Sequence, residues 1–183
     1  EMDDILLICN GEIYNHQALY DAMNITPKTN SDCEVILHLY KDYGIEQTLR
    51  LLDGVFAFIL VDLRLSVEQP LLYVARDPFG VRPLYVLDNS DKSGSFTAFS
   101  SEAKCLTSFH QDLNKNVLTH SQQRGINNVF AKTNKYNLKH YPTGHYSCYK
   151  LSTNVLSSWK LLNTARYHTT GFHNILDKSN LKF

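Results

Sequence analysis

The 183-residue sequence lacks an excess of charge of either sign, and it lacks a long apolar run. Lys plus Arg number 18 and Asp plus Glu number 18, so the net charge is zero. No basic surface is therefore predicted that would attract nucleic acid or an anionic membrane. The longest uninterrupted apolar run, residues 55–61, is far shorter than the roughly 20 residues needed to span a bilayer. We expect neither a nucleic acid nor a membrane as partner.

Paired metal ligands and phosphate-binding loops are also lacking. The four cysteines include no Cys-x-x-Cys pair, and the eight histidines form no His-Glu-x-x-His pattern, which argues against a metal site. Neither glycine-rich nucleotide-binding pattern occurs, so no cofactor is expected in this domain. Cys9, Cys33 and Cys105 lie in apolar or helical contexts. This favours buried free thiols in a reducing compartment and a cytoplasmic location.

What the sequence does contain is a mixture of strand and helix patterns. Short apolar runs predict strands over 5–8, 55–61, 71–75, 83–87 and 96–100, and turn residues join several of them directly. Helices are predicted over 14–23, from Ser31 to Gly44, over 46–52 and over 101–109. Ser31 and Glu34 have the spacing of a capping box. Consecutive strands with hairpin-like connections indicate an α+β fold built on antiparallel sheets.

Composition divides the chain into four stretches. Residues 1–109 are predicted to form the core of one domain. Residues 110–140, which are rich in Asn, Lys, Gln and Thr, are predicted to be a polar insertion or loop. Residues 141–162 would supply the final strands of the same domain, with 155–162 pairing with a strand that ends at 150. Residues 163–183 are expected to be a linker or tail.

The candidate site is Asn10-Gly11-Glu12, which follows the first apolar run. Gly11 permits close approach of the backbone to another group, and Asn10 offers an amide donor. With the Glu12 carboxylate, these residues could stabilise an oxyanion and hold a cation. The alternative is a hairpin turn, for which Asn-Gly is a common signal.

Six segments in one order resemble the glutaminase domain of glutamine-hydrolysing asparagine synthetases. They are Asn-Gly-Glu-Ile-Tyr-Asn at 10–15, Ser-Asp-Cys-Glu at 31–34, Leu-Asp-Gly-Val-Phe-Ala-Phe at 52–58, Arg-Asp-Pro-Phe-Gly-Val-Arg-Pro-Leu-Tyr at 76–85, Ser-Glu-Ala-Lys at 101–104 and Pro-Thr-Gly-His-Tyr at 142–146. This context favours the oxyanion site over the turn. The resemblance implies a class II glutamine amidotransferase with an N-terminal nucleophile hydrolase-like fold, an αββα sandwich of antiparallel sheets, incomplete at its N-terminus.

The resemblance also implies roles for individual residues. Asn10, through its side-chain NH2, and Gly11, through its backbone N–H, would form the oxyanion hole. Glu12 and Asp32 would bind the ammonium group of the substrate glutamine. Arg76 and Asp77 are interpreted as a structural pair that fixes a turn near the site. The ammonia would serve an ATP-using synthetase domain of the parent chain that converts aspartate to asparagine, and ATP and Mg are implied only there.

The sequence departs from this family at the nucleophile. The family uses an N-terminal cysteine followed by Gly-Ile, whereas residue 1 here is Glu1. Cys9 is not a substitute, because it lies inside a strand and has no free α-amine. We therefore expect a fragment of an asparagine synthetase, without its N-terminal cysteine segment and synthetase domain, that is inactive alone. The alternative is a degenerate, non-catalytic glutaminase-like module that binds glutamine or a partner.

Overall fold

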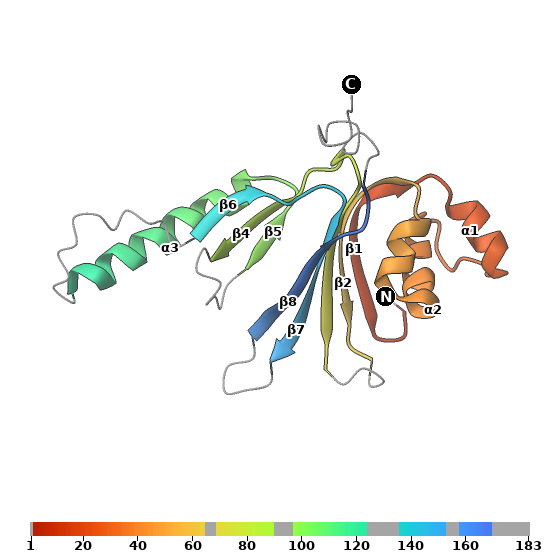
Figure 1. The fold of residues 1–183 in the computed structure, drawn as a ribbon, viewed down its shortest axis with the longest axis horizontal. Helices are drawn as coiled ribbons and strands as arrows, with labels where there is room; N and C mark the ends of the chain where they lie inside the picture. Colours follow the sequence, from red (N-terminus) through yellow and green to blue (C-terminus); the bar gives the residue numbers. More distant parts are fainter. Residues whose placement is uncertain (1, 65–68, 90–96, 124–135, 153–157, 170–183) are drawn as a thin grey trace, which may run out of the picture. The chain divides into compact units, whose positions relative to one another are not determined.

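The computed structural model describes residues 2–64, 69–89, 97–123, 136–152 and 158–169. The described chain contains, in order, β1 (Ile5–Ile13), α1 (His16–Met23), α2 (Glu34–Leu51), β2 (Gly54–Asp62), β3 (Leu71–Arg76), β4 (Tyr85–Asn89), β5 (Ala98–Ser100), α3 (Lys104–Gln123), β6 (Tyr136–His140), β7 (His145–Ser152) and β8 (Ser158–Arg166) (Figure 1). These elements form two compact units, one from residues 1–82 with 142–183 and one from residues 83–141. None of the helices in the described residues combines the length and hydropathy needed to cross a membrane.

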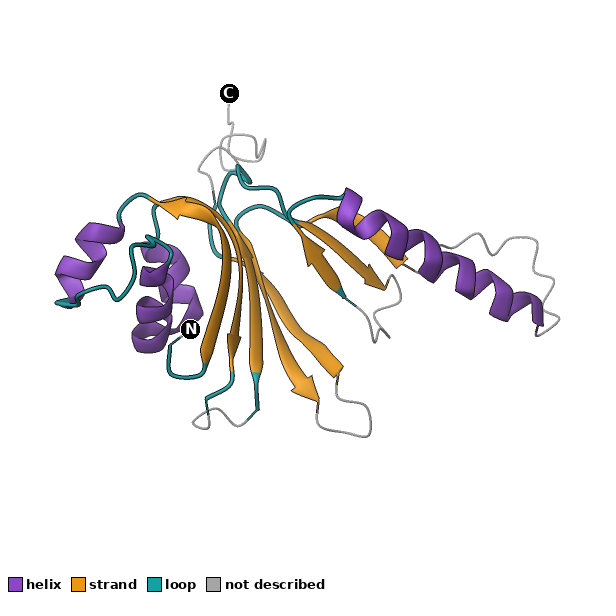
Figure 2. Ribbon diagram, turned by 180° about the vertical axis from the view of Figure 1, so that it is seen from behind, coloured by secondary structure: helices purple, strands orange, loops and turns teal. Residues whose placement is uncertain are grey.

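The first unit is built on a five-stranded sheet in the order β1-β2-β3-β7-β8. Every neighbouring pair in it is antiparallel. The register sets Asn10 of β1 opposite Ala57 and Gly11 opposite Phe56. Helices α1 and α2 lie beside β1 in both ribbon views (Figures 1 and 2). β1 is the end strand of this order, so within the described residues one of its edges carries no strand.

The core of the first unit lies between α2 and the sheet. α2 contributes buried side chains including Val35, Ile36 and Leu39, and β2 contributes Phe56 and Phe58. Side chains alternate between the two faces of a strand, and β1 shows this clearly. Its odd-numbered residues from Ile5 to Ile13 belong to the helix-covered face, where Ile5 and Ile13 are buried. Its even-numbered residues belong to the opposite face.

The second unit is a three-stranded antiparallel sheet in the order β5-β4-β6 with helix α3. α3 packs against β5 and β6. Its first described turns bury Leu106. Leu84 and Tyr141 lie at the two ends of this unit, and the Tyr141 N–H donates to the Leu84 carbonyl over 2.8 Å. The chain therefore enters and leaves the unit at adjacent points.

The predicted α+β class with antiparallel sheets is confirmed. β2, β3, α1 and the β7–β8 pair occur where the sequence predicted them. Gly44 interrupts α2 as expected, with φ of 71° and ψ of 174°. β1 is longer than predicted, since it continues through residues 9–13, and Asn10-Gly11 is part of a strand rather than a turn.

The prediction of a loop over 110–140 is wrong wherever those residues are described. α3 extends through Gln123, and β6 covers Tyr136–His140. The abundance of Asn, Thr and Gln concealed an apolar stripe at Leu106, Leu113 and Val117, which recur at helical intervals. Residues 124–135 of this stretch lie outside the described residues.

The prediction that a tail begins at residue 163 is also wrong, because residues 163–166 belong to β8. β8 continues to Arg166 because it pairs with β7 as far as His145. Residues 170–183 lie outside the described part of the chain.

Candidate functional site at the edge of β1

The free edge of β1 presents backbone groups in a fixed alternation. Ile5 exchanges both of its backbone hydrogen bonds with Met2 rather than with β2. In an antiparallel pair, every second residue faces away from the partner strand. The odd-numbered residues of β1 therefore direct their N–H and C=O groups to this edge. Gly11 is one of them, so its N–H lies in the plane of the sheet and is directed away from β2.

Gly11 is required by its close approach to β2. A Cβ atom at this position would lie 2.5 Å from the Val55 carbonyl oxygen and 2.8 Å from Phe56 Cα. Both are backbone atoms that cannot move without disturbing β2. The glycine is thus explained by strand packing, and the same packing fixes where its N–H points.

Asp32 lies at the same edge of β1. Its Oδ2 atom accepts a hydrogen bond from the Ile13 N–H, which is two residues along the edge from Gly11. Asp32 and Gly11 also line a cavity of about 400 Å³ between β1 and the start of α2. The structure therefore brings together two of the four predicted site residues, from positions 21 apart in the sequence (11 to 32).

Asn10 and Glu12 belong to the opposite face of β1. Asn10 is half-buried and Glu12 is exposed, and neither lines the cavity. Asn10 is next to Gly11, so its amide can approach a point above the edge while the Gly11 N–H approaches it in the sheet plane. Cys9 lies on the helix-covered face, on the other side of the strand from Asn10. This separation adds a physical reason against Cys9 as the nucleophile for an oxyanion held by Asn10.

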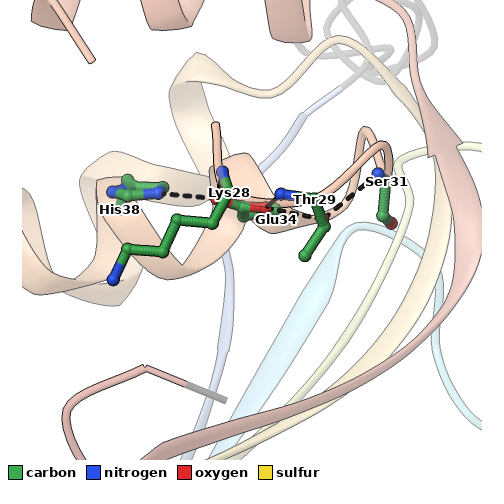
Figure 3. A network of polar contacts seen from close by, with 5 residues as sticks. All are labelled: Lys28, Thr29, Ser31, Glu34 and His38. Carbon is green, nitrogen blue, oxygen red and sulfur yellow. Dashed lines mark hydrogen bonds and ion pairs between the residues drawn. The ribbon is translucent and has the colours of Figure 1, made fainter. Parts of the chain in front are cut away.

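Glu34 is held by a polar network at the start of α2 (Figure 3). Its carboxylate accepts from the Lys28 N–H over 2.7 Å, from the Thr29 N–H over 2.6 Å and from the Thr29 hydroxyl over 2.5 Å. The His38 ring lies 3.2 Å away on the next turn of the helix. The segment 28–34 is thereby tied to the helix that follows it.

This network corrects the predicted capping box. The N-cap position of α2 is Cys33 rather than Ser31, and it makes no side-chain capping bond. The Ser31 carbonyl instead accepts from the Glu34 N–H. Glu34 bonds to the loop because the N–H groups of Lys28 and Thr29 would otherwise need other partners.

The same hydrogen bonds determine the charge state of Glu34. Burial raises the pKa of Glu34, but hydrogen bonds from Lys28, Thr29 and His38 outweigh that effect and lower the pKa to about 2. The carboxylate is therefore charged throughout the neutral range.

Two cysteines meet beside this site. The Sγ atoms of Cys9 and Cys33 are 3.2 Å apart, and the Cys33 Sγ is 4.0 Å from the Gly11 carbonyl oxygen. Both thiols are free and half-buried, and both line the cavity. The sequence did not reveal this pair, because its members are 24 positions apart. The prediction that Cys105 is buried is wrong, since its thiol is exposed.

Arg76 and Asp77 bind the backbone of the turn that follows β3. Arg76 donates to the carbonyl oxygens of Gly80 and Arg82 over 2.9 and 2.8 Å. Asp77, which is fully buried, accepts from the N–H groups of Phe79, Val81 and Arg82. Both residues hold the loop closed. Among the described residues, no group of three or more His, Cys, Asp or Glu side chains could hold a metal ion.

Comparison with known proteins gives one family match. Residues 1–160 match the model of the glutamine amidotransferase domain. The antiparallel sheets and three helices of the described residues are consistent with the N-terminal nucleophile hydrolase-like fold of such domains.

Three similar proteins are each named asparagine synthetase (glutamine-hydrolyzing). The protein of that name from Mesocricetus auratus is 49% identical over 104 residues, which are 56% of this chain and 17% of the relative. The Homo sapiens protein is 45% identical over 102 residues, 55% of this chain and 17% of the relative. The Gallus gallus protein is 47% identical over 102 residues, which are 55% of this chain and 17% of the relative. The chain thus matches about a sixth of the length of these relatives.

Proposed function

Because the chain belongs to the family of glutamine amidotransferase domains, we propose that it is the glutamine-binding part of an asparagine synthetase. The observation that carries this proposal is the β1 edge, where the Gly11 N–H lies next to the Ile13–Asp32 hydrogen bond. A fixed backbone donor and a carboxylate at one strand edge match the two charged features of the reaction, an oxyanion and a substrate ammonium group.

The oxyanion would lie above the free edge of β1. The Gly11 N–H would donate to it from the sheet plane, and the Asn10 amide would donate from the face above. The pairing of β1 with β2 fixes the backbone of Asn10 and Gly11, so little reorganisation of the backbone would be needed when charge develops. Loss of one such donor lowers the rate by about 10²–10³-fold in enzymes where it has been measured.

The ammonium group of glutamine would be bound by Asp32 and Glu12. Asp32 is held at the edge by the Ile13 N–H, which fixes its carboxylate before the substrate arrives. Glu12 is exposed on the adjacent face and can approach the same ligand from the solvent side. A charge-assisted hydrogen bond contributes about 1.5–3 kcal/mol.

The wider assignment follows the relatives. The chain would release ammonia from glutamine for an ATP- and Mg-using synthetase domain that converts aspartate to asparagine in the cytoplasm. In this proposal the nucleophile is not supplied by Cys9. We accordingly expect no glutamine hydrolysis from the 183-residue chain alone.

Glutamine binding tests the proposal directly. Titration calorimetry of the folded chain should detect L-glutamine, and Asp32→Ala and Glu12→Gln should each weaken binding by about ten-fold or more, since 1.4 kcal/mol is a factor of ten. Glu12→Gln is informative because this exposed side chain is not needed for folding. Asp42→Asn, which removes an exposed carboxylate from α2, is the matched control and should bind as the wild type does.

Two results would contradict the proposal. One is a folded wild-type chain that does not bind glutamine. The other is unchanged affinity in both Asp32→Ala and Glu12→Gln. Separately, glutamine hydrolysis by this chain that survives Asn10→Ala would remove Asn10 from the oxyanion hole.

A further inference from the structure

The Cys9–Cys33 pair joins two segments of the candidate site. Cys9 lies on β1, two residues before Gly11, and Cys33 lies at the N-cap of α2, next to Asp32. The two sulfur atoms are 3.2 Å apart. A disulfide bond is about 2.05 Å long, so an approach of only about 1 Å would close it. The adjoining cavity of about 400 Å³ is large enough to admit a small oxidant.

The two thiols differ in acidity. The hydrogen bond with Cys9 lowers the pKa of Cys33, although burial and the charge of Asp32 act in the other direction. The same hydrogen bond and burial raise the pKa of Cys9. A thiolate is the reactive form of cysteine, and a helix N-terminus favours it. Cys33 is therefore the attacking thiol and Cys9 the resolving thiol.

We propose that Cys9 and Cys33 form a reversible modification site at which a hydroperoxide oxidises the dithiol to a disulfide. The Cys33 thiolate attacks one peroxide oxygen, the O–O bond breaks, and a sulfenic acid forms as hydroxide leaves and is protonated to water. The Cys9 thiol then attacks the Cys33 sulfur, an S–S bond forms, and a second water leaves. In sum, two thiols and hydrogen peroxide give one disulfide and two waters. A small-molecule dithiol reverses the modification.

The disulfide would fix residues 31–33 on the edge of β1. In the reduced protein this segment is held by the Asp32–Ile13 hydrogen bond and by the contact of Cys33 with the Gly11 carbonyl. A covalent link at Cys33 restrains its neighbour Asp32 at the same time. Oxidation is therefore expected to slow the opening of the Ile13 N–H to solvent. An effect on glutamine would rest on the function proposed above, whereas formation of the disulfide does not.

The test uses the full 183-residue chain, reduced and then exposed to hydrogen peroxide. Peptide mapping by mass spectrometry should find Cys9 linked to Cys33 within one molecule, and the number of free thiols counted after unfolding should fall from four to two. Dithiothreitol should restore them. Closing a loop of this length should raise Tm by about 5–10 °C, and exchange of the Ile13 amide should slow by about ten-fold or more.

Matched variants identify the two roles. Cys105→Ser removes an exposed thiol on α3 and should leave the linkage and its Tm shift unchanged. Cys33→Ser should abolish both. In Cys9→Ser, dimedone should label Cys33 as a trapped sulfenic acid and leave the other cysteines unlabelled.

The proposal is overturned if peroxide gives no Cys9–Cys33 linkage in the folded chain, or if Cys33 reacts no faster than Cys105. A linkage that forms without slowing exchange at Ile13 would overturn the proposed restraint of Asp32. These outcomes are independent of glutamine. A chain that forms the disulfide but binds no glutamine would contradict only the proposed function, and the reverse result would contradict only this inference.

Discussion

Single carboxylates determine how the segment before α2 is arranged. Glu34 is 9% exposed, and its oxygens accept hydrogen bonds from both Lys28 and Thr29. Asp32, two residues earlier, accepts from Ile13 on β1. One carboxylate therefore ties the segment to its own preceding loop, and the other ties it to the sheet edge. The position of Asp32 depends on the hydrogen bonds of both carboxylates, because movement of the loop would displace Asp32.

Replacing Glu34 by Gln should destabilise the protein by about 1–3 kcal/mol, because charge-assisted hydrogen bonds to this buried carboxylate are lost. The sign of the pH dependence follows from the pKa of Glu34, which is about 2 in the folded protein against an ordinary value of 4.5. The stabilisation is fully present above pH 4.5 and is lost as the pH falls toward 2. The stability difference between wild type and Glu34→Gln should therefore narrow over that interval in urea unfolding.

Glu102→Gln is the matched control for this experiment. Glu102 makes an exposed ion pair with Lys104, and exposed pairs contribute roughly 0–1 kcal/mol. A Glu34→Gln variant as stable as Glu102→Gln at neutral pH would show that the hydrogen bonds of Glu34 contribute little to stability.

At the scale of elements, α2 is two helical segments joined at a kink. Gly44 has φ of 71° and ψ of 174°, a backbone conformation that is essentially restricted to glycine. A Cβ atom at Gly44 would meet no other atom within 4 Å, so space is not the constraint. The kink lets Tyr40 reach Asp62 on β2 over 2.8 Å, while Leu49 is still buried in the core.

Gly44→Ala distinguishes a kinked helix from a straight one. In a continuous helix, Ala in place of Gly would stabilise by about 0.5–1 kcal/mol. At a positive φ it should instead destabilise by about 1–3 kcal/mol. Urea unfolding of the variant gives the sign, and a more stable variant would contradict the kink. Asp42→Asn, two residues away and exposed, serves as the neutral comparison.

At the scale of the whole molecule, the large hydrophobic core belongs to one unit. All of its buried members, from Met2 to Tyr146, lie within residues 1–82 and 142–183. The other unit is an insertion between them, and its ends meet at the hydrogen bond between Leu84 and Tyr141. Because those ends are as close as the partners in a hairpin, a short loop can join them.

Replacing residues 85–140 by a glycine–serine linker of about three residues should leave the first unit folded. We expect a cooperative urea transition followed by circular dichroism, because the core cluster is retained. Deleting β7 and β8 instead is the control, since it removes two of the five strands and should abolish the transition. A broad, non-cooperative transition in the linker variant would contradict the autonomy of the first unit.

The sequence by itself determined the antiparallel α+β class, most of the strands, the break at Gly44 and the amidotransferase motifs. These features are encoded locally, since apolar periodicity, turn residues and glycine conformations act over a few neighbours. The start of α3 was predicted over 101–109, but its continuation to Gln123 was missed because polar residues around Leu113 obscured the apolar stripe, although that signal was also local.

Only the tertiary structure decided which residues share the edge of β1. Asp32 bonds to Ile13, and Cys33 contacts Cys9. Asn10 lies on the opposite face of β1 from Cys9. The register of β1 on β2 and the position at which α2 begins determine this arrangement. Contacts between residues about 20 positions apart depend on that packing and leave no periodic trace in the sequence. The donor at Gly11 could be named from its motif, but its direction followed from the strand pairing.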